Sequence, residues 1–280
     1  MDEDERIVGT HSIDEVKTFV NKMIKDGAKN ASTWDQRMED AKLNVRAGEA
    51  ANVTIWLQSM APTNATSRLQ DAATAFMFGL KQGVFTGREE LEDIHLDALK
   101  EWLRVVSLTF PGNFNRKLVA DLYEKTVVLH YLDYETWQTM VSAWQADTVT
   151  LFATQKVDNS APTWQRIPDL FDNEGIEYHG CALYTCGQWN LFHMMTVNGG
   201  KDNTPPSDEV LMAVVSVSRR FMRYFFGCVQ CREHFLKENP LDVVKSMAAS
   251  KNKTRLLPLW LWKMHNSVNT RVGHHSFPLV

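Results

Sequence analysis

Residues 207–226 read "SDEVLMAVVSVSRRFMRYFF", a run typical of one long helix that begins at Ser207 and ends just before Gly227. Apolar stripes of helical period recur along the chain, and no strand-like alternation of any length accompanies them. The helices that these other stripes predict cover residues 12–27, 88–112, 133–145 and 256–272. The sequence therefore predicts an all-α protein built as helical bundles.

The bulk composition excludes several classes of protein. The chain has 280 residues, 44% of them apolar, and a net charge of −4, so it lacks the basic character of nucleic-acid binders. No apolar run approaches the length of a membrane span, and the acidic opening "MDEDERIVGT" lacks the apolar region of a signal peptide. The 4 cysteines are too few to replace a core in a chain of this size.

A change of composition divides the chain. Residues 155–180 contain prolines, glycines and several Asp and Asn residues that break the helical rhythm, which predicts a linker or a long crossover. Before it lies a helical domain, residues 1–154, that has no cysteine and to which we assign no chemistry. After it lies a second domain, residues 181–280, that holds every cysteine.

Three stretches of the second domain carry the residues able to do chemistry. They are "CALYTCGQWNLFHMMTV" (181–197), "GCVQCREHF" (227–235) and "WLWKMHNSVNTR" (260–271). On helices, Trp189 and His193 are four residues apart and share a face. Trp262, His265 and Asn269 share another face. Rings and polar groups of this kind, offered by several helices, suit a flat heteroaromatic cofactor that carries phosphates.

The Cys-X-X-Cys pair, Cys228 and Cys231, is followed one helical turn later by His234. Cys228 is expected to open a helix, directly after the long helix that ends before Gly227. The N-terminus of a helix stabilises a thiolate and lowers the pKa of a cysteine, which suits disulfide exchange.

Two other interpretations fit the same residues. A Trp/His pair at helical spacing, taken alone, is more often packed core than a ligand site. Cys181, Cys186, Cys228 and Cys231 also have spacings compatible with a Cys₄ zinc site. The protein would then be a non-enzymatic helical scaffold with bound zinc or structural disulfides, and the spacing alone favours redox chemistry only modestly.

Taken together, three segments resemble the Erv/ALR family of FAD-dependent sulfhydryl oxidases, and within it the quiescin sulfhydryl oxidases (QSOX). They are "YTCGQWNLFHMMTV" (184–197), "YFFGCVQCREHF" (224–235) and "LWLWKMHNSVNTRV" (259–272). The resemblance covers residues 175–280 closely. It implies that the second domain is an Erv-like four-helix bundle that holds FAD, with no metal. The first domain resembles, weakly and mainly at "SLTFPG", the pseudo-Erv domain of QSOX, which has no cofactor.

The resemblance also implies roles for individual residues. Cys228 and Cys231 would be the redox-active disulfide, with Cys231 facing the flavin and Cys228 exposed to substrate, and Cys181 and Cys186 would form a structural disulfide. The positions that match FAD contacts are Trp189, His193, His234, Trp262, His265, Asn266, Val268 and Asn269. The chain departs from the family at His179-Gly180, where QSOX members usually have Arg-Gly.

The reaction implied is the oxidation of dithiols to disulfides, with electrons passing through FAD to O₂ to give hydrogen peroxide. We expect a monomeric piece of a longer oxidase, whose thioredoxin-like domain would supply the electrons. Disulfide formation requires an oxidising compartment, so the secretory pathway or the cell exterior is expected. The 4 glycosylation sequons, at Asn30, Asn52, Asn64 and Asn252, favour the same compartment.

Overall fold

A computed structural model describes residues 65–154, 167–172, 178–181, 183–197, 207–249 and 253–273. The predicted helix at 12–27 and the four sequon asparagines lie outside these residues. All described residues belong to one compact unit, Met60–Val280. None of the described helices is long and apolar enough to cross a membrane.

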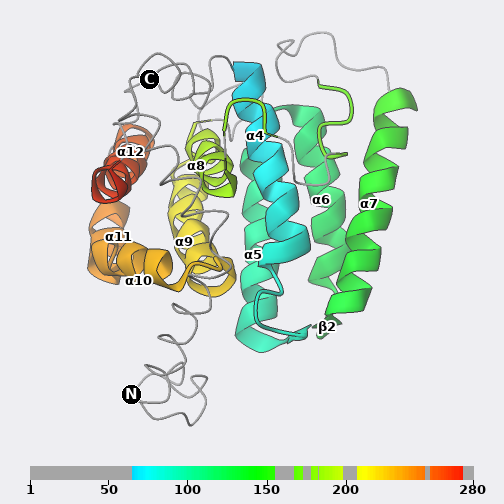
Figure 1. Cartoon of the computed structure of the whole chain (residues 1–280), viewed down its shortest axis with the longest axis horizontal. Coiled ribbons are helices and arrows are strands. Elements are labelled where there is room, and N and C mark those ends of the chain that lie inside the picture. The colour runs from blue at the N-terminus through cyan, green and yellow to red at the C-terminus, as the bar shows by residue number, and fades with distance from the viewer. Residues whose placement is uncertain are drawn as a thin grey trace, which may run out of the picture. The chain divides into compact units, whose positions relative to one another are not determined.

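The described part of the chain is almost entirely helical, which confirms the all-α prediction (Figure 1). The first group of helices is α4 (Ala65–Phe78), the π-helical turn η3 (Gly79–Gly83), α5 (Asp93–Thr109), α6 (Asn113–Val127) and α7 (Tyr134–Thr154). The second group is α8 (Tyr184–Met195), α9 (Asp208–Phe225), α10 (Val229–Glu238), α11 (Leu241–Ala248) and α12 (Lys253–Val272). Two short strands, β1 (Glu90–Leu91) and β2 (Leu132–Asp133), pair antiparallel with Glu90 opposite Asp133.

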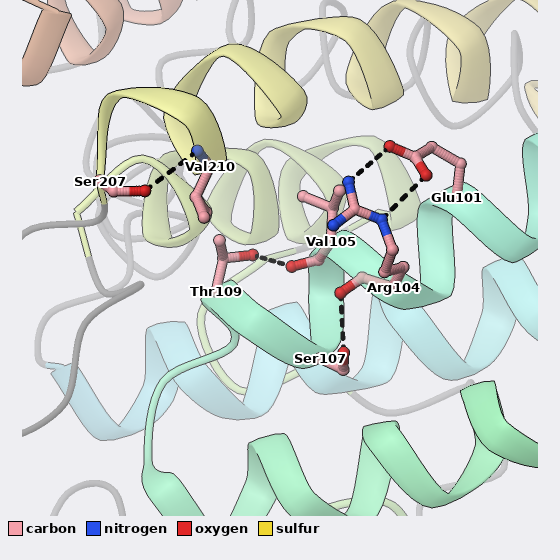
Figure 2. Close-up of polar contacts among 7 residues, drawn as sticks. All are labelled: Glu101, Arg104, Val105, Ser107, Thr109, Ser207 and Val210. Carbon is pink, nitrogen blue, oxygen red and sulfur yellow. Dashed lines mark hydrogen bonds and ion pairs between the residues drawn. The ribbon is translucent and has the colours of Figure 1, made fainter.

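Side-chain caps set the helix starts that the sequence predicted. The Ser207 hydroxyl accepts a hydrogen bond from the Val210 N–H at 3.4 Å, and the next residue begins α9. Asp133 Oδ1 accepts one from the Thr136 N–H at 2.8 Å before α7. Figure 2 shows the Ser207 cap together with polar contacts of α5, where Arg104 forms a two-point ion pair with Glu101 at 2.8 and 3.0 Å. Since α5 packs against α9, the cap helps to fix the start of a core helix.

Helices from both sides of the predicted linker share one hydrophobic core. In Figure 1, α4 lies beside α8, and the two helices pack extensively against each other. The helices α5 and α9 form a second extensive contact. At the centre, the Trp102 ring of α5 lies 6.0 Å from the Phe192 ring of α8 and 4.5 Å from the Phe221 ring of α9. Residues 155–166 and 173–177 lie outside the described residues, so the linker itself stays a prediction.

Within residues 181–280, predicted to be a second domain, α8, α9, α10 and α12 pack around one another. α9 contacts each of the other three, and α8 also contacts α12. This is the four-helix arrangement that the resemblance implied for residues 181–280. α12 begins at Lys253, three residues before the predicted start, so Pro258 lies inside the helix. Because Pro258 is still near the helix start, its missing N–H removes only one hydrogen bond to the first turn.

The close approach of α4 and α8 depends on Gly187. A Cβ atom at this position would lie 2.5 Å from the Asp71 carbonyl oxygen and 2.9 Å from the Ala75 Cβ, both on α4. Neither atom can move without displacing the α4 backbone or its neighbours. Only a residue without a side chain therefore fits where the two helices meet.

We expect Gly187→Ala to lower the free energy of unfolding by about 2–3 kcal/mol, because the overpacking outweighs the better helix propensity of alanine. Gly79→Ala is the matched control, since its Cβ would lie 3.4 Å from a Phe221 side-chain atom, an ordinary contact. Urea unfolding followed by far-ultraviolet circular dichroism measures both. Equal stabilities for the two variants would contradict the close approach.

Candidate functional site

All four cysteines form disulfides. Cys181 is bonded to Cys186, with Cα atoms 5.5 Å apart, and Cys228 is bonded to Cys231, with Cα atoms 5.3 Å apart. The structure therefore pairs the cysteines within each stretch and does not gather them into a Cys₄ set. Nor do the described residues contain any other group of three or more His, Cys, Asp or Glu side chains suited to a metal ion.

The Cys228–Cys231 disulfide lies at the N-terminus of α10. Cys228 is the N-cap, and its Sγ accepts a hydrogen bond from the Cys231 N–H at 3.2 Å. The Cys228 side chain is exposed, whereas Cys231 is half-buried and packs against the core. One sulfur thus faces solvent and the other faces the interior, and the positive end of the α10 dipole favours a thiolate at this position.

Rings from α8 and α12 meet beside the core. The Trp189 and His265 rings stack, with centroids 4.5 Å apart and planes 7° from parallel. His193 Nε2 lies 3.1 Å from His265 Nδ1, a hydrogen bond between the two imidazoles. Burial, and to a smaller extent the charge of Arg68, lower the pKa of His193 to about 4, so this ring is neutral at pH 7. The structure therefore brings together three of the ring-bearing residues that the sequence singled out.

His234 lies on α10, one turn after Cys231. Its Nε2 is buried and has no hydrogen-bond partner among the described residues. An unpartnered buried nitrogen costs stability unless a ligand or solvent supplies the missing bond. This atom is therefore well suited to a polar group of a bound cofactor.

The remaining predicted residues lie on α12, the helix that carries His265. They are Trp262, Asn266, Val268 and Asn269, and each is half-buried. Aromatic, imidazole and amide side chains are thus offered by α8, α10 and α12, next to a disulfide. This set of groups can hold a flat heteroaromatic cofactor and its polar substituents.

Sequence reasoning did not find Asp71, a fully buried carboxylate on α4. It accepts hydrogen bonds from three consecutive backbone N–H groups, those of His179 at 2.6 Å, Gly180 at 3.0 Å and Cys181 at 2.9 Å. Burial raises the pKa of Asp71, and the three N–H donors oppose that rise. Asp71 thereby fixes the segment that leads into the Cys181–Cys186 disulfide. The only signal in the sequence is a lone aspartate inside the otherwise uncharged run "LQDAATAFMF".

Asn239, which the sequence also did not reveal, fixes the far end of α10. It is buried, and its Oδ1 accepts a hydrogen bond from the Trp260 Nε1–H at 2.9 Å. Its carbonyl accepts another from Arg219 Nε at 3.0 Å. Asn239 thus ties α10 to both α12 and α9 and helps to hold the three helices in register.

Comparison with known proteins gives one family and a set of curated relatives. Residues 186–279 match the Erv1 / Alr family. Human sulfhydryl oxidase 2 is 27% identical over 203 residues, which cover 67% of this chain and 25% of that protein. Human sulfhydryl oxidase 1 is 28% identical over 246 residues, covering 80% of this chain and 29% of that protein. Chicken (Gallus gallus) sulfhydryl oxidase 1 is 36% identical over 92 residues, covering 32% of this chain and 11% of that protein.

Among solved structures, the "Sulfhydryl Oxidase Fragment of Human QSOX1" aligns with a TM-score of 0.49 and 24% identity, covering 75% of this chain and 79% of that chain. The chain spans less than a third of the length of each of these curated relatives.

Proposed function

We propose that this protein is an FAD-dependent thiol oxidase, because residues 186–279 match the Erv1 / Alr family, in line with the resemblance seen in the motifs. It would convert dithiols into disulfides and pass the electrons to O₂, giving hydrogen peroxide. The observation that carries the proposal is the Cys228–Cys231 disulfide at the start of α10, with one sulfur exposed and the other against the core. The curated relatives, all sulfhydryl oxidases, support the same activity.

The residues present fit FAD. His234 Nε2 is a buried nitrogen without a partner among the described residues, and the stacked Trp189 and His265 rings supply aromatic surface. We assign FAD binding to Trp189, His193, His234, Trp262, His265, Asn266, Val268 and Asn269. When bound, FAD would supply the two-electron redox chemistry needed to restore the Cys228–Cys231 disulfide and to reduce O₂.

The protein's own sulfurs carry the exchange with substrate. A substrate thiolate attacks the exposed Sγ of Cys228, the Cys228–Cys231 bond breaks, and Cys231 leaves with the electron pair as a thiolate. The second substrate thiol loses its proton to solvent and attacks the substrate sulfur of the mixed disulfide. Cys228 is then released as a thiolate and the substrate leaves as a disulfide. The N–H groups at the start of α10 stabilise the negative charge on the cysteine pair.

We assign the Cys181–Cys186 disulfide a structural role, because Cys181 is buried and its Sγ accepts a hydrogen bond from Asn190 Nδ2 at 3.4 Å. We also propose that the protein acts as a monomer in the secretory pathway or outside the cell, with a thioredoxin-like domain as its electron donor. Disulfide formation needs such an oxidising compartment.

The visible absorption spectrum of the purified protein tests the proposal. A flavin band is expected that bleaches when dithiothreitol is added and returns in air, with consumption of one O₂ per disulfide formed. A colourless protein that also fails to bind added FAD would contradict the proposal.

A further inference from the structure

A tight turn from the first group of helices packs against the segment that leads into Cys228. This turn, residues 84–88, follows η3 and is called the 84–88 turn below. Within it, the Arg88 N–H donates a hydrogen bond of 3.0 Å to the Phe85 carbonyl. At its exposed tip, the Thr86 methyl group lies 3.6 Å from the position of a Cβ on Gly227, the residue before Cys228. The turn therefore touches the entry to the redox disulfide, although it lies about 140 positions earlier in the chain.

Arg88 makes the polar contact of this turn. Its Nη1 donates a hydrogen bond of 2.7 Å to the carbonyl of Tyr224. Tyr224 lies in the last turn of α9, where helix carbonyls have no partner within the helix and the helix dipole is negative. A guanidinium group there caps α9 and fixes where the chain leaves it, four residues before Cys228.

A second arginine, adjacent in sequence to the disulfide, interacts with Arg88. Arg232 directly follows Cys231, and burial together with the charge of Arg232 lowers the pKa of Arg88. The Arg88 guanidinium therefore lies close enough to Arg232, the residue after Cys231, for the two charges to interact.

We propose that Arg88 is a positioning residue for the Cys228–Cys231 disulfide. It holds the Tyr224 carbonyl, and with it the path into Cys228, and its charge favours the thiolate that Cys231 becomes when the disulfide opens. The relevance to catalysis rests on the proposed oxidase function. The effect on the disulfide itself does not, because opening of the disulfide by a dithiol requires neither flavin nor O₂.

The test is the equilibrium, in the absence of O₂, between the purified protein and dithiothreitol at pH 7, with the reduced Cys228–Cys231 pair counted by alkylation and mass spectrometry. Loss of a nearby cation destabilises the thiolate, so Arg88→Gln is expected to shift the equilibrium about three- to tenfold toward the disulfide. Arg88→Lys, which keeps the charge, is expected to stay within about twofold of the unmodified protein. An unshifted Arg88→Gln protein would overturn the proposal.

Arg116 provides a matched control. Its Nη1 donates to the Phe110 carbonyl at 3.1 Å, a contact of the same kind just after the end of α5. Arg116→Gln should leave the disulfide equilibrium unchanged. If it shifted the equilibrium as much as Arg88→Gln does, the effect would come from a general loss of stability and not from the position of Arg88. That outcome also overturns the proposal.

A surface variant keeps the test decisive if Arg88→Gln does not fold. Thr86 is exposed, so Thr86→Lys adds a cation beside Gly227 without disturbing the core. It is expected to shift the equilibrium about two- to threefold toward the dithiol, whereas Thr86→Gln is not. Identical equilibria for these two variants would contradict the electrostatic part of the proposal. None of these equilibrium measurements depends on turnover. Failure of the proposed oxidase function would therefore appear in the visible spectrum and not in the disulfide equilibrium.

Discussion

A Cys228→Ser variant is expected to lose dithiol oxidation by about a thousandfold or more, while it keeps bound FAD. In the proposed mechanism the substrate thiolate attacks the exposed Cys228 sulfur, and a serine oxygen cannot form the mixed disulfide. Oxygen consumption with dithiothreitol measures the loss, and the visible spectrum measures the retained cofactor. Full turnover in this variant would contradict the assignment of the disulfide.

The matched control removes the other disulfide. Cys181→Ser with Cys186→Ser leaves the Cys228–Cys231 pair intact, so turnover at low temperature is expected to fall by less than about tenfold. The free energy of unfolding should fall by about 2 kcal/mol, because the bond closes only a short loop. If this double variant lost turnover as completely as Cys228→Ser, the two disulfides could not be assigned separate roles.

An Asp71→Asn variant is expected to lower the free energy of unfolding by about 2–4 kcal/mol. Both carboxylate oxygens accept backbone hydrogen bonds, with Oδ1 bonded to the His179 N–H and Oδ2 to the N–H groups of Gly180 and Cys181. An amide of the same size has only one acceptor oxygen, so its NH₂ group would face at least one buried N–H donor. Urea unfolding of the oxidised protein gives the difference.

Asp121→Asn is the control for this change. Asp121 forms an ion pair with Lys125 at 2.7 Å, in which both side chains are about 40% exposed. Such a pair contributes about 0–1 kcal/mol, so the control should unfold almost like the unmodified protein. Equal destabilisation by both substitutions would show that the Asp71 hydrogen bonds contribute nothing special.

The predictable part of the fold is the part that local chemistry determines. The caps at Ser207 and Asp133 made the starts of α9 and α7 predictable. The other bounds were less accurate, because α7 continues to Thr154, past the predicted end at residue 145, and α5 covers Asp93–Thr109 within the predicted 88–112. The helix α6 has Gly112 as its N-cap, with no side-chain hydrogen bond, and so offered no start signal. Ile94 lies in the helix predicted over residues 88–112, at a position where helical period favours burial, but it is 41% exposed.

The candidate site likewise has a part that the sequence predicts and a part that it does not. Helical spacing places Trp189 and His193 on one face and explains why Cys228 opens α10, since both depend on residues a few positions apart. The stacking of Trp189 on His265 depends on how α8 meets α12, and the Asp71 contacts join residues more than 100 positions apart. Such pairings follow from the packing of the whole core, which no local pattern encodes.

The shared core of α4, α5, α8 and α9 has a consequence for how the chain is made. A ribosome that adds ~5–20 residues per second needs on the order of 10 s to proceed from the end of α4 to the start of α9. During that time α4 and α5 have emerged, but the helices that cover their apolar faces have not. The nascent chain therefore presents a hydrophobic surface that a chaperone can bind.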